Sequence, residues 1–198
     1  MELNINNIIQ LLTILSSTLI ISFLTLLSIF NQDIKVLLYI SGLVVTYISV
    51  FIITRTTGFN IPLEQRSSIC DFMDIPGIAK MYEPSVNSLF IAFTATYMII
   101  PMMFNNNINI MMVIFFVVLF VLDAYYRLVN KCNKGLGIGT GLILGILFGF
   151  VWFYILQLNN FSQVLYFGEV MSNNVVCSSK QAEFVCFDKD NNQINFSN

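Results

Sequence analysis

The chain has 198 residues, of which 57% are hydrophobic and only 10% are charged, whereas soluble domains carry about 25% charged residues. Together with a mean hydropathy of +0.78, this composition excludes an ordinary soluble domain and predicts an integral membrane protein. The formal net charge is −2, so the sequence offers no basic surface for nucleic acid. The chain contains no histidine, which excludes Ser-His-Asp and Cys-His catalysis and any metal site built on histidine.

Apolar runs long enough to cross a membrane follow one another along the chain, since about 20 apolar residues span the hydrocarbon core. We predict an all-α fold, a polytopic transmembrane helical bundle of about five spans that occupies residues 1–158. The predicted spans are residues 8–30, 34–54, 88–104, 108–127 and 136–156. Residues 159–198 are predicted to form a small polar C-terminal tail, in which 175–176 and 184–185 can pair as a hairpin.

The last predicted span carries a regular series of glycines. They stand four residues apart, at Gly137, Gly141, Gly145 and Gly149, and a step of four keeps them on one slowly drifting helix face. Small residues on such a face allow two membrane helices to approach to backbone contact. The spacing therefore predicts a helix-packing face.

The distribution of basic residues predicts how the bundle is oriented. Five spans place the N-terminus, loop 55–87 and the corner 127–135 on one side of the membrane. That side holds six of the nine Lys and Arg residues: Arg55, Arg66, Lys80, Arg127, Lys131 and Lys134. Because cytoplasmic loops carry the excess of Lys and Arg, we expect the N-terminus and loop 55–87 in the cytosol and the tail in the lumen or outside the cell.

Four cysteines leave two questions open. Cys177 and Cys186 flank the predicted hairpin and can form a disulfide in an oxidising compartment. The alternative is two reduced thiols in the tail, and sequence alone does not fix cysteine pairing. Cys70 and Cys132 are too few and too far apart in the sequence for a zinc site, so we expect no metal and no cofactor.

Two segments on the same side of the membrane carry a recognisable order of residues. The third span opens with Pro84-Ser85-Val86-Asn87-Ser88, and the fourth ends at Tyr126-Arg127, followed by Asn133 and the glycines from Gly137 onward. Over about residues 55–150 this pattern resembles the type 2 phosphatidic acid phosphatase superfamily of membrane lipid phosphatases. That family has Pro-Ser-x-His-Ser at the start of one span. It has Ser-Arg, five residues, His, three residues and Asp before a glycine-rich span.

The departures from the family pattern remove its chemistry. Asn87 and Asn133 stand at the two histidine positions, Gly137 stands at the acid position, and the family's first motif has no clear counterpart. The resemblance implies a histidine that attacks phosphorus and a second that protonates the leaving oxygen. Asparagine can do neither, so we expect a pseudoenzyme. The family also has six spans and catalytic loops facing the lumen or cell exterior, which conflicts with the charge-based orientation.

The residues at the former catalytic positions have two interpretations. They can form a vestigial pocket that binds a lipid headgroup or an anion, made of Ser85, Asn87, Ser88, Arg127 and Asn133. Alternatively, Ser85 caps the third span, Asn87 lies in its first turn, and Arg127 pairs with Asp123 four residues earlier. We favour the second, structural interpretation.

The sequence as a whole predicts a non-catalytic membrane protein that serves as a scaffold or structural component of a membrane assembly. The abundance of Asn and Ile and the scarcity of Ala suggest an AT-rich genome, and hence a viral inner membrane, as in a virion, or an organellar complex. Expected partners are membrane lipids and other membrane or capsid proteins, contacted through the glycine face, loop 55–87 or the tail. A lipid-headgroup-binding module is the first alternative, and an active lipid-modifying phosphatase or transferase is the second.

Overall fold

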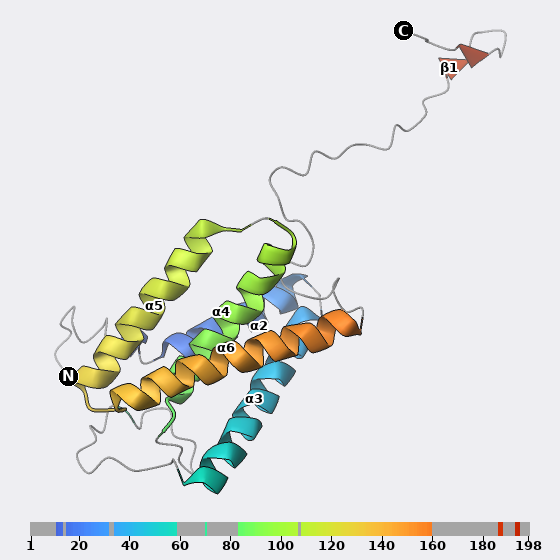
Figure 1. Cartoon of the computed structure of the whole chain (residues 1–198). Coiled ribbons are helices and arrows are strands. Elements are labelled where there is room, and N and C mark those ends of the chain that lie inside the picture. The colour runs from blue at the N-terminus through green and yellow to red at the C-terminus, as the bar shows by residue number, and fades with distance from the viewer. Residues whose placement is uncertain are drawn as a thin grey trace.

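A computed structural model describes residues 11–13, 15–31, 34–58, 70, 83–106 and 108–159, and the backbone of 186–187 and 193–194. Figure 1 shows a bundle of α-helices. The helices are α2 (Ser16–Asn31), α3 (Lys35–Thr57), α4 (Val86–Phe104), α5 (Ile110–Val129) and α6 (Gly135–Leu158). A short antiparallel pair joins β1 (Cys186–Phe187) to β2 (Gln193–Ile194).

The helices identify a multi-pass membrane protein. Four of them, α3 to α6, have 19 to 24 residues and are apolar enough to cross a membrane. Helix α2 has 16 residues and is therefore about 24 Å long at 1.5 Å per residue. Residues 11–13, which belong to the predicted span 8–30, are also helical, whereas residues 8–10 lie outside the described part of the chain.

Local signals fix where several helices begin and end. Helix α3 continues three residues beyond its predicted end and stops before Gly58, whose φ of 67° is left-handed and favours glycine. Helix α5 begins two residues later than predicted, because the side chain of Asn109 accepts a hydrogen bond from the backbone N–H of Met112 and so caps the helix. The tail hairpin predicted at 175–176 and 184–185 lies outside the described residues.

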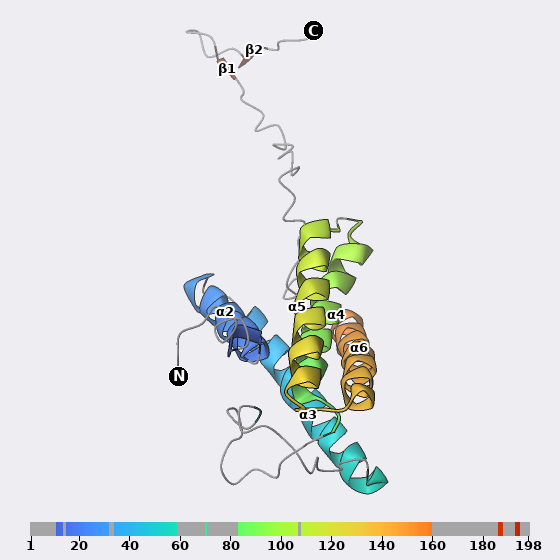
Figure 2. The same ribbon diagram turned by 90° about the vertical axis from the view of Figure 1, so that its left-hand side faces the viewer.

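Helix α4 is the centre of the bundle. In the 18-residue apolar stretch of α4, 61% of the residues are buried, against 11% in the corresponding stretch of α5. Figure 2 shows α2 and α6 on opposite sides of α4. Leu89, Phe93 and Tyr97 of α4 are fully buried, and the Phe93 and Tyr97 rings stack with centroids 6.1 Å apart. The Tyr39 hydroxyl of α3 lies 2.6 Å from the Thr94 hydroxyl, which supplies a hydrogen bond between buried polar groups in an apolar layer.

The glycine series of α6 packs against the backbone of α4. A Cβ atom added at Gly141, Gly145 or Gly149 would lie 2.6, 2.5 or 3.0 Å from a backbone carbonyl oxygen of α4 or its cap. Those oxygens belong to Ser85, Leu89 and Phe93, which are also four residues apart. A row of glycines on α6 therefore faces a row of backbone carbonyl oxygens on α4 and its cap, both with a spacing of four residues. Among the described residues, α4 and α6 form the largest interface between two helices.

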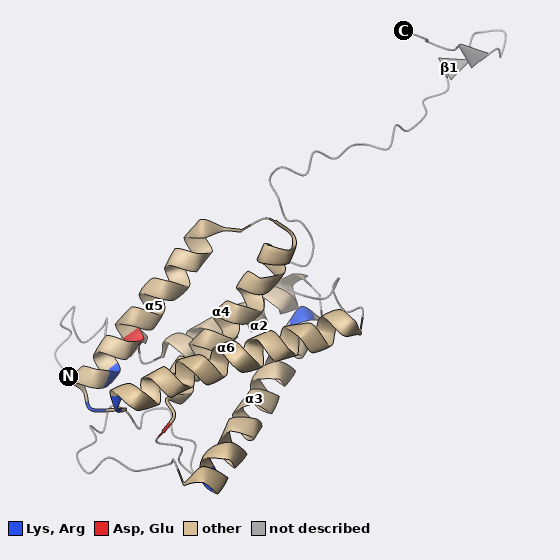
Figure 3. Ribbon diagram, viewed as in Figure 1, with Lys and Arg blue, Asp and Glu red and all other residues tan. Residues whose placement is uncertain are grey.

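In the part of the chain that the structure describes, the charged residues lie in the turns near the helix ends or in the connections between helices. Figure 3 shows acidic and basic segments gathered where α5 ends and α6 begins, while the middle of the bundle is uncharged. This distribution is expected of a membrane protein, because a charge in the hydrocarbon core is costly. The charged end contains the residues that the sequence singled out.

Candidate functional site

The start of α4 is fixed by its cap and by α6. Ser85 precedes the helix in an extended conformation, and its Oγ accepts a hydrogen bond from the Ser88 backbone N–H at 3.4 Å. The Ser85 backbone N–H donates to the carbonyl oxygen of Gly137 at 2.9 Å. A backbone hydrogen bond therefore joins the N-terminal ends of α4 and α6. This bond fixes the position of one helix along the axis of the other.

Asp123 of α5 organises the polar side chains at this end. Its side chain is 1% exposed. Asn87 Nδ2 and Arg127 Nε both donate to Asp123 Oδ1, the latter at 2.9 Å, and Ser88 Oγ donates to Oδ2 at 3.2 Å. A buried carboxylate is stabilised only when it is paired and hydrogen-bonded, and here both oxygens of Asp123 accept hydrogen bonds.

Helix α2 extends the network from the other side of α4. Asn87 Nδ2 donates to Ser16 Oγ at 3.2 Å, and Ser17 Oγ donates to Asn87 Oδ1. Asn87 therefore uses both ends of its amide to link α2 to α5. We call the connected group the polar cluster, and its members are Ser16, Ser17, Asn87, Ser88, Asp123, Arg127 and Asn133.

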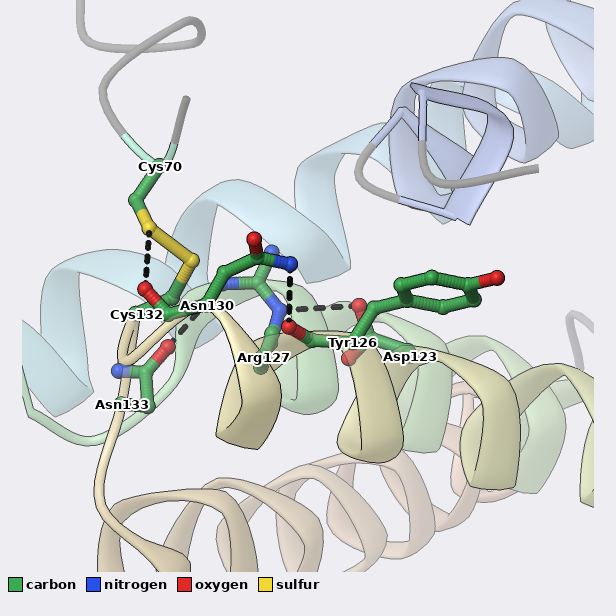
Figure 4. Close-up of a disulfide and its surroundings, with 7 residues drawn as sticks. All are labelled: Cys70, Asp123, Tyr126, Arg127, Asn130, Cys132 and Asn133. Atoms are coloured by element: carbon green, nitrogen blue, oxygen red, sulfur yellow. Dashed lines mark hydrogen bonds and ion pairs between the residues drawn. A yellow bond between two sulfur atoms is a disulfide. The ribbon is translucent and has the colours of Figure 1, made fainter. Parts of the chain in front are cut away.

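The corner between α5 and α6 closes the polar cluster. Arg127 Nη1 donates to Asn133 Oδ1 at 3.0 Å, and Figure 4 shows the guanidinium between Asp123 and Asn133. The backbone N–H of Cys132 also donates to the carbonyl oxygen of Arg127 at 2.8 Å. The corner is thus folded back onto the last turn of α5, and Asn133 is 6% exposed.

Glu83 supplies a second buried carboxylate, which the sequence analysis did not single out. Its Oε1 accepts a hydrogen bond from the backbone N–H of Lys134, the residue that caps α6, at 2.7 Å. A Cβ atom at Gly137 would lie 1.0 Å from Glu83 Oε2. The first glycine of the series therefore makes room for this carboxylate, which is favoured at a helix N-terminus by the helix dipole.

A disulfide joins Cys70 to Cys132, which are 62 positions apart in the sequence, with an S–S distance of 2.00 Å. It attaches loop 55–87 to the corner beside the polar cluster (Figure 4). The sequence spacing of these cysteines was weighed only for a zinc site, and the bond between them was not predicted. The sequence did hold one indication of this disulfide, because the predicted spans place Cys70 and Cys132 on the same side of the membrane. The question whether Cys177 and Cys186 form a disulfide or stay reduced lies outside the described residues, because Cys177 is not among them.

The structure brings together every residue of the suggested vestigial pocket. Asn87, Ser88 and Arg127 bond directly to Asp123, and Asn133 bonds to Arg127. Ser85 joins through the Ser88 hydroxyl, whose Oγ lies 3.0 Å from its own. Both contacts expected from the structural interpretation, the Ser85 cap and the Asp123–Arg127 pair, are present.

The chemistry of this group is that of a hydrogen-bonded core. Its amides and hydroxyls bond to one another and to one carboxylate, so their polar atoms are directed inward. Such a network makes packing specific when its members are satisfied. Searches for related proteins found no match to a protein-family model, a curated protein or a solved structure.

Proposed function

We propose that this chain is a non-catalytic, multi-pass membrane protein that serves as a structural component of a membrane assembly. One observation carries the proposal. The two asparagines at the positions of the phosphatase histidines, Asn87 and Asn133, bond to Asp123 and Arg127 inside the bundle. Residues that would act on a substrate in an enzyme here hold α2, α4, α5 and the corner together.

We further propose that α2 is part of a first span, which gives five spans in total. Ser16 and Ser17 of α2 bond to Asn87 at the start of α4. The two helices therefore lie side by side at the level of the polar cluster. Residues 11–13 extend the helical stretch beyond α2, toward the length that a span requires.

The proposed origin is a lipid-phosphatase-like bundle that has lost its chemistry. Asparagine cannot form a phosphoryl-enzyme or donate a proton near neutral pH. Glu83 occupies the space beside Gly137, the position of the family's acid, but its Oε1 accepts from a backbone N–H. We place the protein in a viral inner membrane or an organellar complex, on the basis of its AT-rich residue usage.

The glycine face is unsuitable as the contact for a partner protein. Gly141, Gly145 and Gly149 are buried against α4 of the same chain. We therefore propose that partners bind loop 55–87 or the tail. Purification of the full chain from its own membrane in mild detergent tests this, since a scaffold copurifies with a stoichiometric partner and a solitary chain would contradict the proposal.

A lipid-headgroup-binding module is the second candidate, and one observation favours it. Lys131 and Lys134 are exposed on either side of Asn133, so two cationic residues reach the surface next to the polar cluster. The double variant Lys131→Gln/Lys134→Gln separates the candidates, because it leaves the hydrogen bonds of the cluster in place. A thermal shift by anionic lipid that this variant abolishes would favour the binding module, whereas partner copurification that the variant leaves intact would favour the scaffold.

A further inference from the structure

The Cys70–Cys132 disulfide indicates which compartment one end of the bundle faces, which the helices alone do not show. Disulfides persist in oxidising environments such as the endoplasmic reticulum lumen, the periplasm or the cell surface, and thiols are kept reduced in the cytosol. Cys132 is 1% exposed and lies in the corner between α5 and α6, and Cys70 belongs to the loop between α3 and α4. The bond therefore places the α3–α4 loop and the α5–α6 corner in the same compartment.

The connectivity extends this to the whole bundle. Helices α3 and α5 end, and helices α4 and α6 begin, at the end of the bundle that contains the disulfide. Helix α6 then has 24 residues and is long and apolar enough to cross the membrane, so its C-terminal end at Leu158 lies on the other side. The polar cluster and the C-terminal end of α6 therefore lie on opposite sides of the membrane.

Two of the basic residues on the disulfide side have partners within the bundle. Arg127 forms an ion pair with buried Asp123 at 2.9 Å, so its charge is compensated within the bundle. The Arg55 guanidinium lies over the Phe51 ring at 5.2 Å from its centroid, close to its own helix. Arg127 and Arg55 are therefore held by contacts within α5 and α3.

We infer that the disulfide end of the bundle, with the polar cluster and loop 55–87, faces an oxidising compartment, and that the C-terminal tail faces the cytosol. This orientation is the reverse of that expected from counting basic residues. It is independent of the proposed structural function, because either orientation is compatible with a scaffold. It assigns the tail, rather than loop 55–87, to contacts with cytosolic partners.

Cysteine chemistry on the unmodified full chain tests this inference. The chain is made in sealed endoplasmic reticulum microsomes, treated with a membrane-impermeant maleimide before or after detergent, and digested without reductant. We expect Cys177 and Cys186 to be alkylated before detergent is added, and a disulfide-linked peptide pair containing Cys70 and Cys132. The matched control is Cys177→Ser/Cys186→Ser, which removes the alkylation that arises from the tail.

Two results would overturn the inference. One is a tail whose cysteines resist the maleimide until detergent opens the vesicles, or resist it even then because they are oxidised. The other is recovery of Cys70 and Cys132 as reduced, alkylated thiols. The proposed function would survive either result, since it is tested by copurification and not by orientation.

Discussion

Gly145 of α6 lies directly against the carbonyl oxygen of Leu89 in α4, where a Cβ atom would approach that oxygen to 2.5 Å. Four residues before and after it, Gly141 and Gly149 lie in the same way against the carbonyl oxygens of Ser85 and Phe93. Backbone contact of this kind gives two membrane helices close van der Waals packing without a hydrophobic driving force. The contact between α4 and α6 is therefore the main packing surface of the bundle, and it fixes the position of the polar cluster at its end.

The first prediction concerns this contact. Gly145→Ala introduces a Cβ atom that meets backbone, which cannot move aside as a side chain can, so we expect destabilisation of about 1–3 kcal/mol by overpacking. Gly139→Ala is the matched control on the same helix, because a Cβ atom at Gly139 meets nothing within 4 Å. The measurement is thermal unfolding of the purified chain in detergent. Equal melting temperatures for the two variants would show that the glycine face does not pack as described.

The second prediction concerns Asp123. Asp123→Ala leaves Asn87, Ser88 and Arg127 without their shared acceptor, and breaking a buried ion pair in this way costs about 3–5 kcal/mol. Removing Arg127 as well eliminates the uncompensated charge. The double variant Asp123→Ala/Arg127→Ala is therefore expected to be more stable than the sum of the single effects.

Thermal unfolding of the four proteins of this cycle measures the coupling. Strict additivity would mean that Asp123 and Arg127 act independently, which is incompatible with the ion pair. A conservative check is Asp123→Asn, which preserves the side-chain shape but removes the charge. We expect it to lie between wild type and Asp123→Ala.

The third prediction concerns Glu83 and Gly137. Gly137→Ala places a Cβ atom in the space taken by the Glu83 carboxylate, so we expect it to destabilise the chain. Glu83→Ala removes that carboxylate and loses a helix-terminus interaction worth about 0.3–1 kcal/mol. In the double variant the methyl group has room, so Gly137→Ala should cost much less in the Glu83→Ala background. An equal cost of Gly137→Ala in both backgrounds, measured by unfolding, would rule out this contact.

The fourth prediction concerns the disulfide. Native disulfides typically stabilise by about 2–4 kcal/mol, so a reductant should lower the melting temperature of the wild-type chain. It should have no further effect on the Cys70→Ser/Cys132→Ser variant, which lacks the bond. The Cys177→Ser/Cys186→Ser variant is expected to keep the wild-type response. Loss of the response in that tail variant would instead assign the stabilising bond to the tail.

Parts of this architecture follow from sequence patterns that act over short distances. Four long apolar helices could be predicted from run length, and the glycine face from its period of four. The Asp123–Arg127 pair could be predicted because an i, i+4 spacing places both side chains on one helix face. Each of these features is contained within a single helix.

The remaining features depend on contacts between helices. The glycines of α6 pack against the backbone carbonyl oxygens of Ser85, Leu89 and Phe93. Every residue type has such a carbonyl group, so the sequence does not mark which residues of α4 the glycines contact. Ser16 and Ser17 resemble ordinary small residues of a membrane helix until Asn87 is placed beside them. Glu83 lies just outside α4 and was not distinguished from the charged loop before it. The Cys70–Cys132 bond could not be derived either, since four cysteines allow three pairings.

The most direct test of the central claim, that the polar cluster is structural and not catalytic, is phosphate release by the purified full chain. Phosphatidic acid in mixed micelles is the substrate, and Asn87→Ala is the control, because residue 87 corresponds to a catalytic histidine in the phosphatases that the sequence resembles. We predict no release by the wild-type chain above that of the control, together with a lower melting temperature for the control. Phosphate release by the wild-type chain that Asn87→Ala abolishes without loss of folded protein would contradict the account.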